Sequence, residues 1–131
     1  MTTTDYGSAV REKLSGPTRD LRRAIPAVYE GYKQLYDAAL APGALDVATK
    51  ELIALAIAVT RGCDGCIAAH AHAAAHHGAA PEQVAEALGV SILMNGGTGT
   101  VYGARAYAAF LEFHQDRAAG PPAAAHTAHT A

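Results

Sequence analysis

The sequence predicts an all-α fold, a bundle of about six helices, and three observations lead to this prediction. No segment alternates apolar and polar residues with β-branched enrichment, so no strand is expected. Half of the 131 residues are apolar, yet only 6% are aromatic and tryptophan is absent. The core must therefore consist of Ala, Leu, Ile and Val, and such small side chains favour closely packed helices.

The first segments indicate a helical flank. Residues 6–24 are a charged, loosely patterned lead-in. Pro26 stands where it can open a helix running to about residue 39, because proline is well tolerated in a first helical turn. The tripeptide APG at 41–43 ends that helix. One side of this helix is expected to carry Val28, Tyr32, Leu35 and Tyr36.

The next helices have clear start and stop signals. Asp46 is the expected N-cap of a helix over residues 47–60 that ends near Gly62. A third helix is expected to start around residue 64 and stop at Gly78. Pro81 begins a fourth helix, which NGGTG at 95–99 interrupts. The last helix has an apolar stripe of Tyr102, Ala106, Phe110 and Phe113.

These elements amount to one domain. We expect a helical flank over residues 1–40, a core domain over 41–117 and a disordered tail over 118–131. The tail, AAGPPAAAHTAHTA, is low in complexity, so no specific role is expected for its two histidines, His126 and His129.

Charge and hydropathy exclude several classes of function. The formal net charge of −2 provides no basic field for a phosphate backbone, so no nucleic-acid partner is expected. The longest apolar run, residues 52–59, is too short to cross a bilayer, and the N-terminus has no apolar signal region. We therefore expect a cytoplasmic protein without a membrane partner.

The stretch GCDGCIAAHAHAAAHHG at 62–78 concentrates the reactive side chains, with both cysteines and four of the seven histidines. On a helical wheel, one face carries Cys63, Cys66, His70 and His77. His72 and His76 lie roughly opposite and are interpreted as solvated surface residues, with a weak metal pair as the alternative. His77, near the helix end, is interpreted as a partner of the helix dipole or a packing residue.

Cys66 and His70 suggest a nucleophile beside a base. A CxxC pair at a helix start brings two sulfurs within bonding distance, and unpaired N–H groups there stabilise a thiolate. His70 follows Cys66 by one turn, so its imidazole can take a proton from that thiol. Alternatives are plain buried thiols, a zinc site and a thioredoxin-like pair. The ligands share one helix and no βαβ unit is predicted, so no metal and no cofactor are expected.

Glu51 is an acid in an otherwise apolar helix. It is too far along this helix to cap it, and its face also carries Val47, Leu55 and Ala58, so its carboxylate is expected to point inward. One interpretation is a partly exposed acid paired with a nearby Lys or Arg. The more specific interpretation is that Glu51 contacts His70 and fixes its tautomer or relays its proton.

Together these residues form the pattern Glu51-x11-Cys63-x2-Cys66-x3-His70, followed by GAAPEQVAEALGVSILMNGG. The pattern resembles the carboxymuconolactone decarboxylase superfamily and, within it, the AhpD-like alkylhydroperoxidase core, over roughly residues 42–113. The resemblance implies an AhpD-like helical bundle that forms a homo-oligomer, commonly a trimer or hexamer. True decarboxylases of this superfamily typically lack the cysteine pair.

The resemblance also implies thiol peroxidase chemistry. Cys66 would attack a peroxide, Cys63 would resolve the resulting sulfenic acid, and Glu51 and His70 would form a proton relay. The helix dipole alone favours Cys63 as the more acidic thiol, but only Cys66 has His70 one turn away. One position departs from the pattern, because Gly65 stands where characterised peroxidase members carry a histidine.

The expected function is reduction of hydrogen peroxide or an organic hydroperoxide, with an external dithiol or protein thiol as reductant. Two alternatives stay open. A dithiol–disulfide oxidoreductase would use the same cysteines without meeting peroxide. A non-enzymatic oligomer would use the cysteines and histidines to hold a metal or a small ligand.

Overall fold

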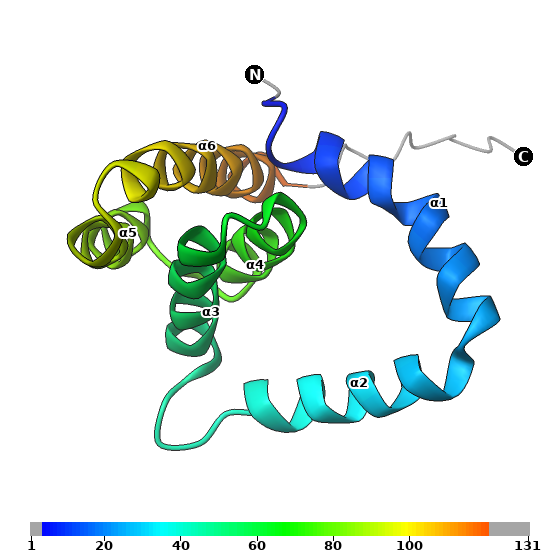
Figure 1. Ribbon diagram of the computed structural model, residues 1–131. Coiled ribbons are helices and arrows are strands. Elements are labelled where there is room, and N and C mark those ends of the chain that lie inside the picture. Colours follow the sequence, from blue (N-terminus) through cyan, green and yellow to red (C-terminus); the bar gives the residue numbers. More distant parts are fainter. Residues whose placement is uncertain (1–3, 121–131) are drawn as a thin grey trace, which may run out of the picture.

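The computed structural model describes residues 4–120, and within them it contains six helices and no strand (Figure 1). This confirms the all-α prediction. The helices are α1 (Ser8–Ala24), α2 (Pro26–Leu40), α3 (Val47–Arg61), α4 (Asp64–His76), α5 (Pro81–Asn95) and α6 (Gly97–Ala119). None of these helices, within the described range, is both long and apolar enough to cross a lipid bilayer.

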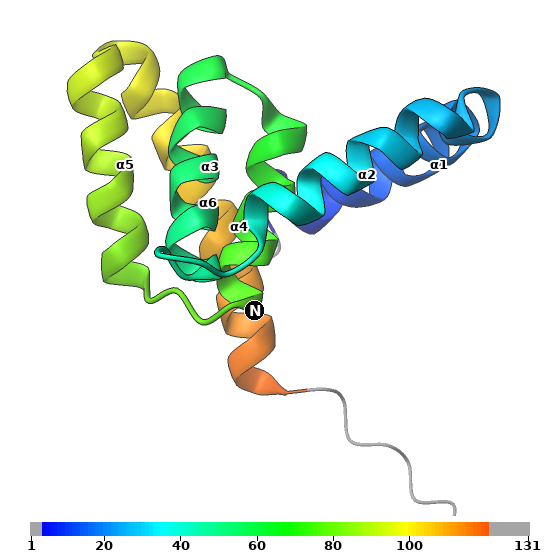
Figure 2. The same ribbon diagram turned by 90° about the horizontal axis from the view of Figure 1, so that it is seen from below.

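Helices α3 to α6 pack into the core bundle, which Figure 2 shows from below. The long helix α6 contacts both α4 and α5, and α3 packs against α4 and α5. Small side chains dominate the interior, as the composition predicts, and Phe110 is its largest fully buried side chain. Other members of this core are Leu55, Val59, Ile67, Ala71, Ala74, Val84, Leu88, Ala106 and Ala109.

Helix α3 has a defined start and a defined end, and the turn to α4 follows that end. Asp46 caps the start of α3, as predicted, because its carboxylate accepts a hydrogen bond from the Thr49 N–H at 2.8 Å. Gly62 ends α3 with φ +62°, in the left-handed region that favours glycine. A Cβ atom at Gly62 would also lie 3.1 Å from the Tyr102 ring. The chain therefore reverses tightly here, and α4 begins directly after Cys63.

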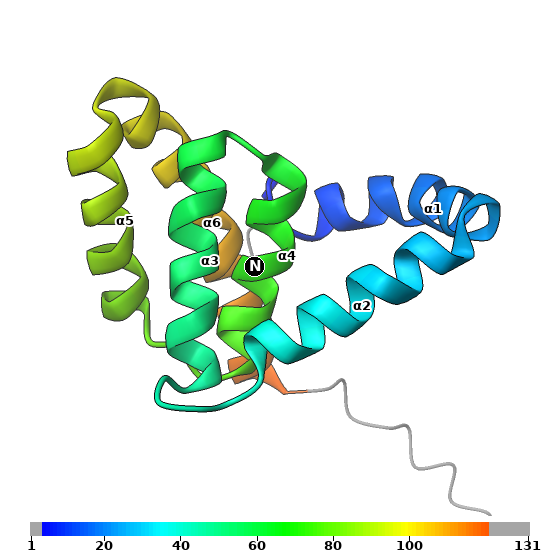
Figure 3. The same cartoon turned by 60° about the horizontal axis from the view of Figure 1, so that its bottom comes forward.

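Helices α1 and α2 form an arm that leaves the core and returns to it, as Figures 1 and 3 show. Residues 6–24, expected as a loosely patterned lead-in, include a regular helix from Ser8 to Ala24. Neither arm helix contains a fully buried residue. The stripe expected on α2 is largely exposed, with Val28 at 63% and Leu35 at 66%. The arm thus presents apolar side chains that the core of the same chain does not cover.

Buried Glu112 of α6 anchors the first end of the arm. Its two carboxylate oxygens accept hydrogen bonds from the backbone N–H groups of Thr4 and Ser8, both at 2.6 Å. Burial disfavours the charged carboxylate, but these hydrogen bonds outweigh it, so the pKa of Glu112 is lowered. Gly7 packs directly on this carboxylate, which leaves no room for a Cβ atom.

Helix α6 continues beyond residue 117, where the predicted core domain ends. Helix α6 extends to Ala119, two residues into the segment for which a tail is predicted. Residues 121–131 of that tail, with His126 and His129, lie outside the described residues.

Candidate functional site

A disulfide joins Cys63 and Cys66 at the start of α4, with their Cα atoms 5.2 Å apart. Cys66 lies in the first turn of α4 and Cys63 is its N-cap residue, so the helix starts at Asp64, as the sequence predicts. The sulfur of Cys63 accepts a hydrogen bond from the Cys66 N–H at 3.2 Å. The pair therefore sits at the positive end of the α4 dipole, where a thiolate is stabilised.

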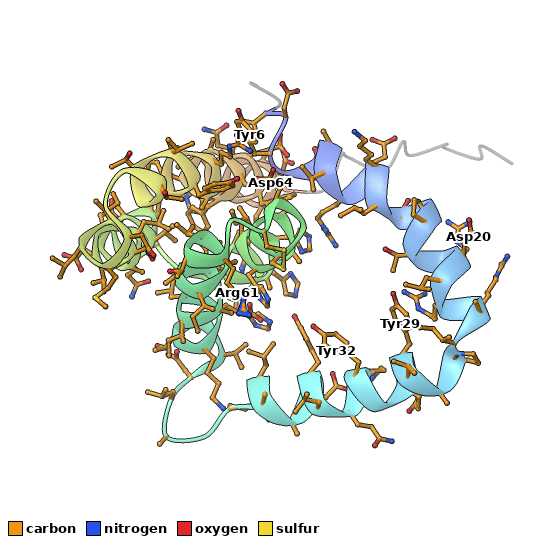
Figure 4. All side chains as sticks on the ribbon, viewed as in Figure 1. Tyr6, Asp20, Tyr29, Tyr32, Arg61 and Asp64 are labelled. Carbon is orange, nitrogen blue, oxygen red and sulfur yellow. A yellow bond between two sulfur atoms is a disulfide. The ribbon has the colours of Figure 1, made fainter. Side chains whose placement is uncertain are left out.

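Arg105 of α6 fixes the turn that carries the cysteines. Its guanidinium donates to a carboxylate oxygen of Asp64 at 2.9 Å, and Asp64 lies between the two cysteines in the chain. The same guanidinium stacks on the rings of Tyr6 and Tyr102, at 5.2 and 4.9 Å from their centroids. Figure 4 shows Tyr6 and Asp64 at this end of the core, where the chain enters α1.

Gly65, the residue before Cys66, packs against the arm. A Cβ atom built there would lie 3.0 Å from Cδ1 of Leu14 in α1. That separation is shorter than an ordinary van der Waals contact, so any larger residue at this position requires the Leu14 side chain to move. Leu14 is 44% exposed and Cδ1 is the end of its flexible side chain, so the histidine of the peroxidases that this pattern resembles would require a small shift of Leu14.

Glu51 and His70 meet across the interface of α3 and α4. The Nδ1–H of His70 donates to Oε2 of Glu51 at 2.7 Å. Glu51 is only 2% exposed, and the His70 side chain is 19% exposed. The Glu51 carboxylate points inward, as expected, and of the two interpretations it is the contact with His70 that the structure shows. This bond fixes the imidazole tautomer and leaves Nε2 as the nitrogen able to accept a proton.

Tyr36 of α2 completes the surroundings of this pair. Its ring stacks near that of His70, with centroids 6.3 Å apart and an interplanar angle of 16°. Burial and then the negative charge of Glu51 raise the pKa of Tyr36 above its usual value of 10.0. Tyr36 lines an open pocket of about 250 Å³ together with Glu51 and His77. It also lines a larger open pocket of about 710 Å³ formed by the arm helices.

The remaining histidines of α4 lie apart from the Glu51–His70 pair or at its edge. His76 is exposed, as expected. His72 is partly buried edge-on against Phe113, 5.0 Å between centroids, and burial lowers its pKa. His77 is the C-cap residue of α4, and its ring packs against that of His76. In the described part of the chain, no group of three or more His, Cys, Asp or Glu side chains is arranged to hold a metal ion.

Sequence reasoning did not identify Tyr36 or Arg105 as parts of the site. The partly buried positions of α2 are Tyr29, Tyr36 and Leu40, which follow one another at intervals of seven and four. This spacing marks one helical face, and it could have singled out Tyr36 from the more exposed apolar residues around it. No local pattern identifies Arg105, because its partner Asp64 lies 41 positions away along the chain.

The arrangement combines a dithiol–disulfide pair, a helix N-terminus and a buried carboxylate–imidazole pair. A thiolate at Cys66 would gain from the α4 dipole, and His70 stands one turn further along the same helix. Such a set of groups is suited to redox or nucleophilic chemistry at sulfur with proton transfer through the imidazole.

Comparisons with known proteins agree with the fold and the pattern. The sequence model of the carboxymuconolactone decarboxylase family matches residues 26–110. A carboxymuconolactone decarboxylase family protein from Legionella pneumophila, known from a crystal structure, superposes with a TM-score of 0.81. It is 37% identical, and the alignment covers 85% of this chain and 99% of that protein.

Two similar sequences come from bacterial proteins whose names describe them as uncharacterized. One, from Cupriavidus necator, is 43% identical over 90 residues, which are 69% of this chain and 80% of the relative. The other, uncharacterized protein 4 in the cox locus of Paracoccus denitrificans, is 34% identical over 100 residues. That alignment covers 76% of this chain and 90% of the relative.

Proposed function

The chain belongs to the carboxymuconolactone decarboxylase family, and from this premise we propose that it is a thiol-dependent peroxidase. Its substrate is an organic hydroperoxide or hydrogen peroxide, and its redox centre is the pair Cys63 and Cys66. Glu51 and His70 move the protons. The observation that carries the proposal is a disulfide one helical turn from a buried Glu51–His70 hydrogen bond.

The reaction consumes one peroxide and one external dithiol in each turnover. With both cysteines reduced, His70 takes the Cys66 proton, and the thiolate attacks the distal peroxide oxygen. The O–O bond breaks, Cys66 becomes a sulfenic acid, and the leaving oxygen takes a proton to form an alcohol or water. The Cys63 thiol then attacks the Cys66 sulfur, and the disulfide forms as water leaves. An external dithiol restores both thiols and becomes a disulfide itself.

Glu51 supports this sequence by holding His70. The carboxylate fixes the protonated nitrogen as Nδ1, so that Nε2 can receive the thiol proton. Once the imidazole is charged, the nearby carboxylate stabilises it, and this favours the thiolate form of Cys66. The dipole of α4 acts in the same direction.

Peroxide consumption in the presence of a dithiol donor tests the proposal. With the donor present, we expect turnover by the wild type and none by Cys66→Ser. Without the donor, reduced Cys63→Ser should consume one peroxide per chain as Cys66 becomes a sulfenic acid. His76→Gln, an exposed position on the same helix, should keep full activity. Disulfide exchange without peroxide turnover would instead identify a dithiol–disulfide oxidoreductase. Stoichiometric zinc that is lost in Cys63→Ser would identify a metal-binding protein.

We also propose that this protein works as a homo-oligomer, a trimer or hexamer. The exposed apolar side chains of the arm support this, because a helix pair without buried residues needs a partner surface. Further exposed apolar residues lie on the core: Ile53, Ile57, Val90, Leu93, Met94 and Val101. Light scattering coupled to gel filtration tests the proposal. A charged substitution such as Leu35→Asp should lower the measured mass, and a monomeric wild type would contradict the proposal.

A further inference from the structure

We propose that Tyr36, on arm helix α2, is a positioning residue for the Glu51–His70 pair, which makes the arm a working part of the redox site. The inference rests on the proposed function for its biological meaning. Its physical content is narrower, namely that the Tyr36 ring sets the environment in which His70 acts on Cys66.

Tyr36 reaches His70 across a gap between two helix backbones. Both helices are fully described by the structure, and no Cα atom of α2 lies within 8 Å of one of α4. The Tyr36 ring nevertheless stacks near the His70 ring, 6.3 Å between centroids. The contact is therefore made by the length of the tyrosine side chain. A shorter residue at this position cannot make it.

The Tyr36 side chain also lines two open pockets, one of about 250 Å³ beside Glu51 and one of about 710 Å³ along the arm. In Figure 4, Tyr29 and Tyr32 point from α2 into the space between arm and core, on the side of the larger pocket. Removal of the Tyr36 ring would uncover the His70 ring and admit more water to the Glu51–His70 pair.

Water at this pair weakens it. An attraction between a carboxylate and an imidazolium is several times stronger in a partly dry site than in bulk water. Titratable and charged groups from four helices line the pockets beside Tyr36: Glu51 from α3, His77 at the end of α4, Arg22 from α1, and Tyr29, Glu30, Tyr32, Lys33 and Asp37 from α2. Because the Tyr36 phenol stays protonated at neutral pH, it brings no second negative charge to compete with Glu51 for His70.

Most of α2 has no such contact. Its large side chains Val28, Tyr32 and Leu35 are all more than half exposed. Tyr36 is thus a point at which the position of the arm is communicated to the redox site. A surface that holds the arm in place, such as a second copy of the chain, would thereby act on the reactivity of Cys66.

The test measures how fast the reduced protein is alkylated by iodoacetamide as a function of pH, which requires no peroxide. In Tyr36→Ala, we expect the midpoint of thiolate formation to rise by about half a pH unit, which slows alkylation at pH 7 about threefold. Tyr36→Phe keeps the ring and should match the wild type. Gln34→Ala, at an exposed position of the same helix that lines neither pocket, is the matched control and should also match it.

Tyr36→Leu, which keeps most of the volume but not the ring, replaces the alanine variant if the latter does not fold. Circular dichroism checks the helix content of each variant. A wild-type pH profile in the folded alanine or leucine variant would overturn the proposal, and so would an equal shift in Gln34→Ala. Failure of the wild type to consume peroxide would refute the proposed function alone, since the shift in alkylation is measured without peroxide.

Discussion

His70 donates its Nδ1–H to Oε2 of Glu51 at 2.7 Å, and this bond joins two helices within the core. The bond connects the buried Glu51 carboxylate to α4, the helix whose first turn carries the exposed Cys66. Glu51 is nearly inaccessible to water, while the His70 side chain keeps 19% exposure. The imidazole thus lies between the interior carboxylate and the surface, one helical turn beyond Cys66 in α4.

Glu51→Gln should slow the reaction of Cys66 with iodoacetamide near neutral pH. The amide keeps the size of the side chain but removes the negative charge that favours a protonated His70, so the thiolate loses its partner. We expect about a tenfold slower alkylation of the reduced protein, which corresponds to about 1.4 kcal/mol. The exposed Glu86→Gln is the matched control. Equal rates in wild type and Glu51→Gln would return Glu51 to a structural role.

Gly65→His should destabilise the protein, and the cost should depend on Leu14. The new Cβ would lie 3.0 Å from Cδ1 of Leu14, so the arm or the leucine must shift. Because Leu14 is 44% exposed and can move, the cost should be smaller than that of overpacking in a closed core, which is about 1–3 kcal/mol. Chemical denaturation of Gly65→His, Leu14→Ala and the double variant measures the coupling between the two positions. Strictly additive effects would show that the two positions do not interact.

Glu112→Gln should lower the free energy of unfolding by about 1–3 kcal/mol at neutral pH. The variant weakens two charge-assisted hydrogen bonds from the N–H groups of Thr4 and Ser8. Because the pKa of Glu112 is lowered from its usual value of 4.5, its stabilising effect is present above that pH. The effect is lost as the pH falls through the lowered pKa.

The difference in stability between wild type and Glu112→Gln should therefore shrink in acid. Urea unfolding at pH 7 and at about pH 3 measures it. A difference that stays constant over this range would mean that the carboxylate charge contributes nothing. Proteolysis gives an independent measurement, because a detached N-terminus should be cleaved within α1 before the core.

The sequence predicted local features well and the surroundings of the site poorly. Asp46 as a cap and Gly62 as a stop are decided by neighbouring residues, and an inward Glu51 follows from the apolar periodicity of its helix. The predicted start of the next helix around residue 64 is confirmed, since α4 begins at Asp64 with Cys63 as its N-cap residue. Tyr36 and Arg105 act through contacts between distant segments, which periodicity within one helix does not encode.

The arm illustrates the same limit. Its helix α1 has a charged sequence with few strong start signals, and buried Glu112, far along the chain, holds the segment before it. The apolar face of α2 was expected from its spacing, but the core of the same chain leaves Val28 and Leu35 exposed. Spacing identifies an apolar face, whereas the surface that covers it depends on tertiary or quaternary structure.

The most direct measurement identifies the cysteine that a hydroperoxide oxidises first. Reduced Cys63→Ser is treated with one equivalent of an alkyl hydroperoxide in the presence of dimedone, which traps sulfenic acids, and the labelled peptide is identified by mass spectrometry. The proposed mechanism predicts one dimedone adduct on Cys66, and none on Cys63 in the Cys66→Ser variant. An adduct on Cys63, or an unlabelled Cys66 while the hydroperoxide is consumed, would contradict it.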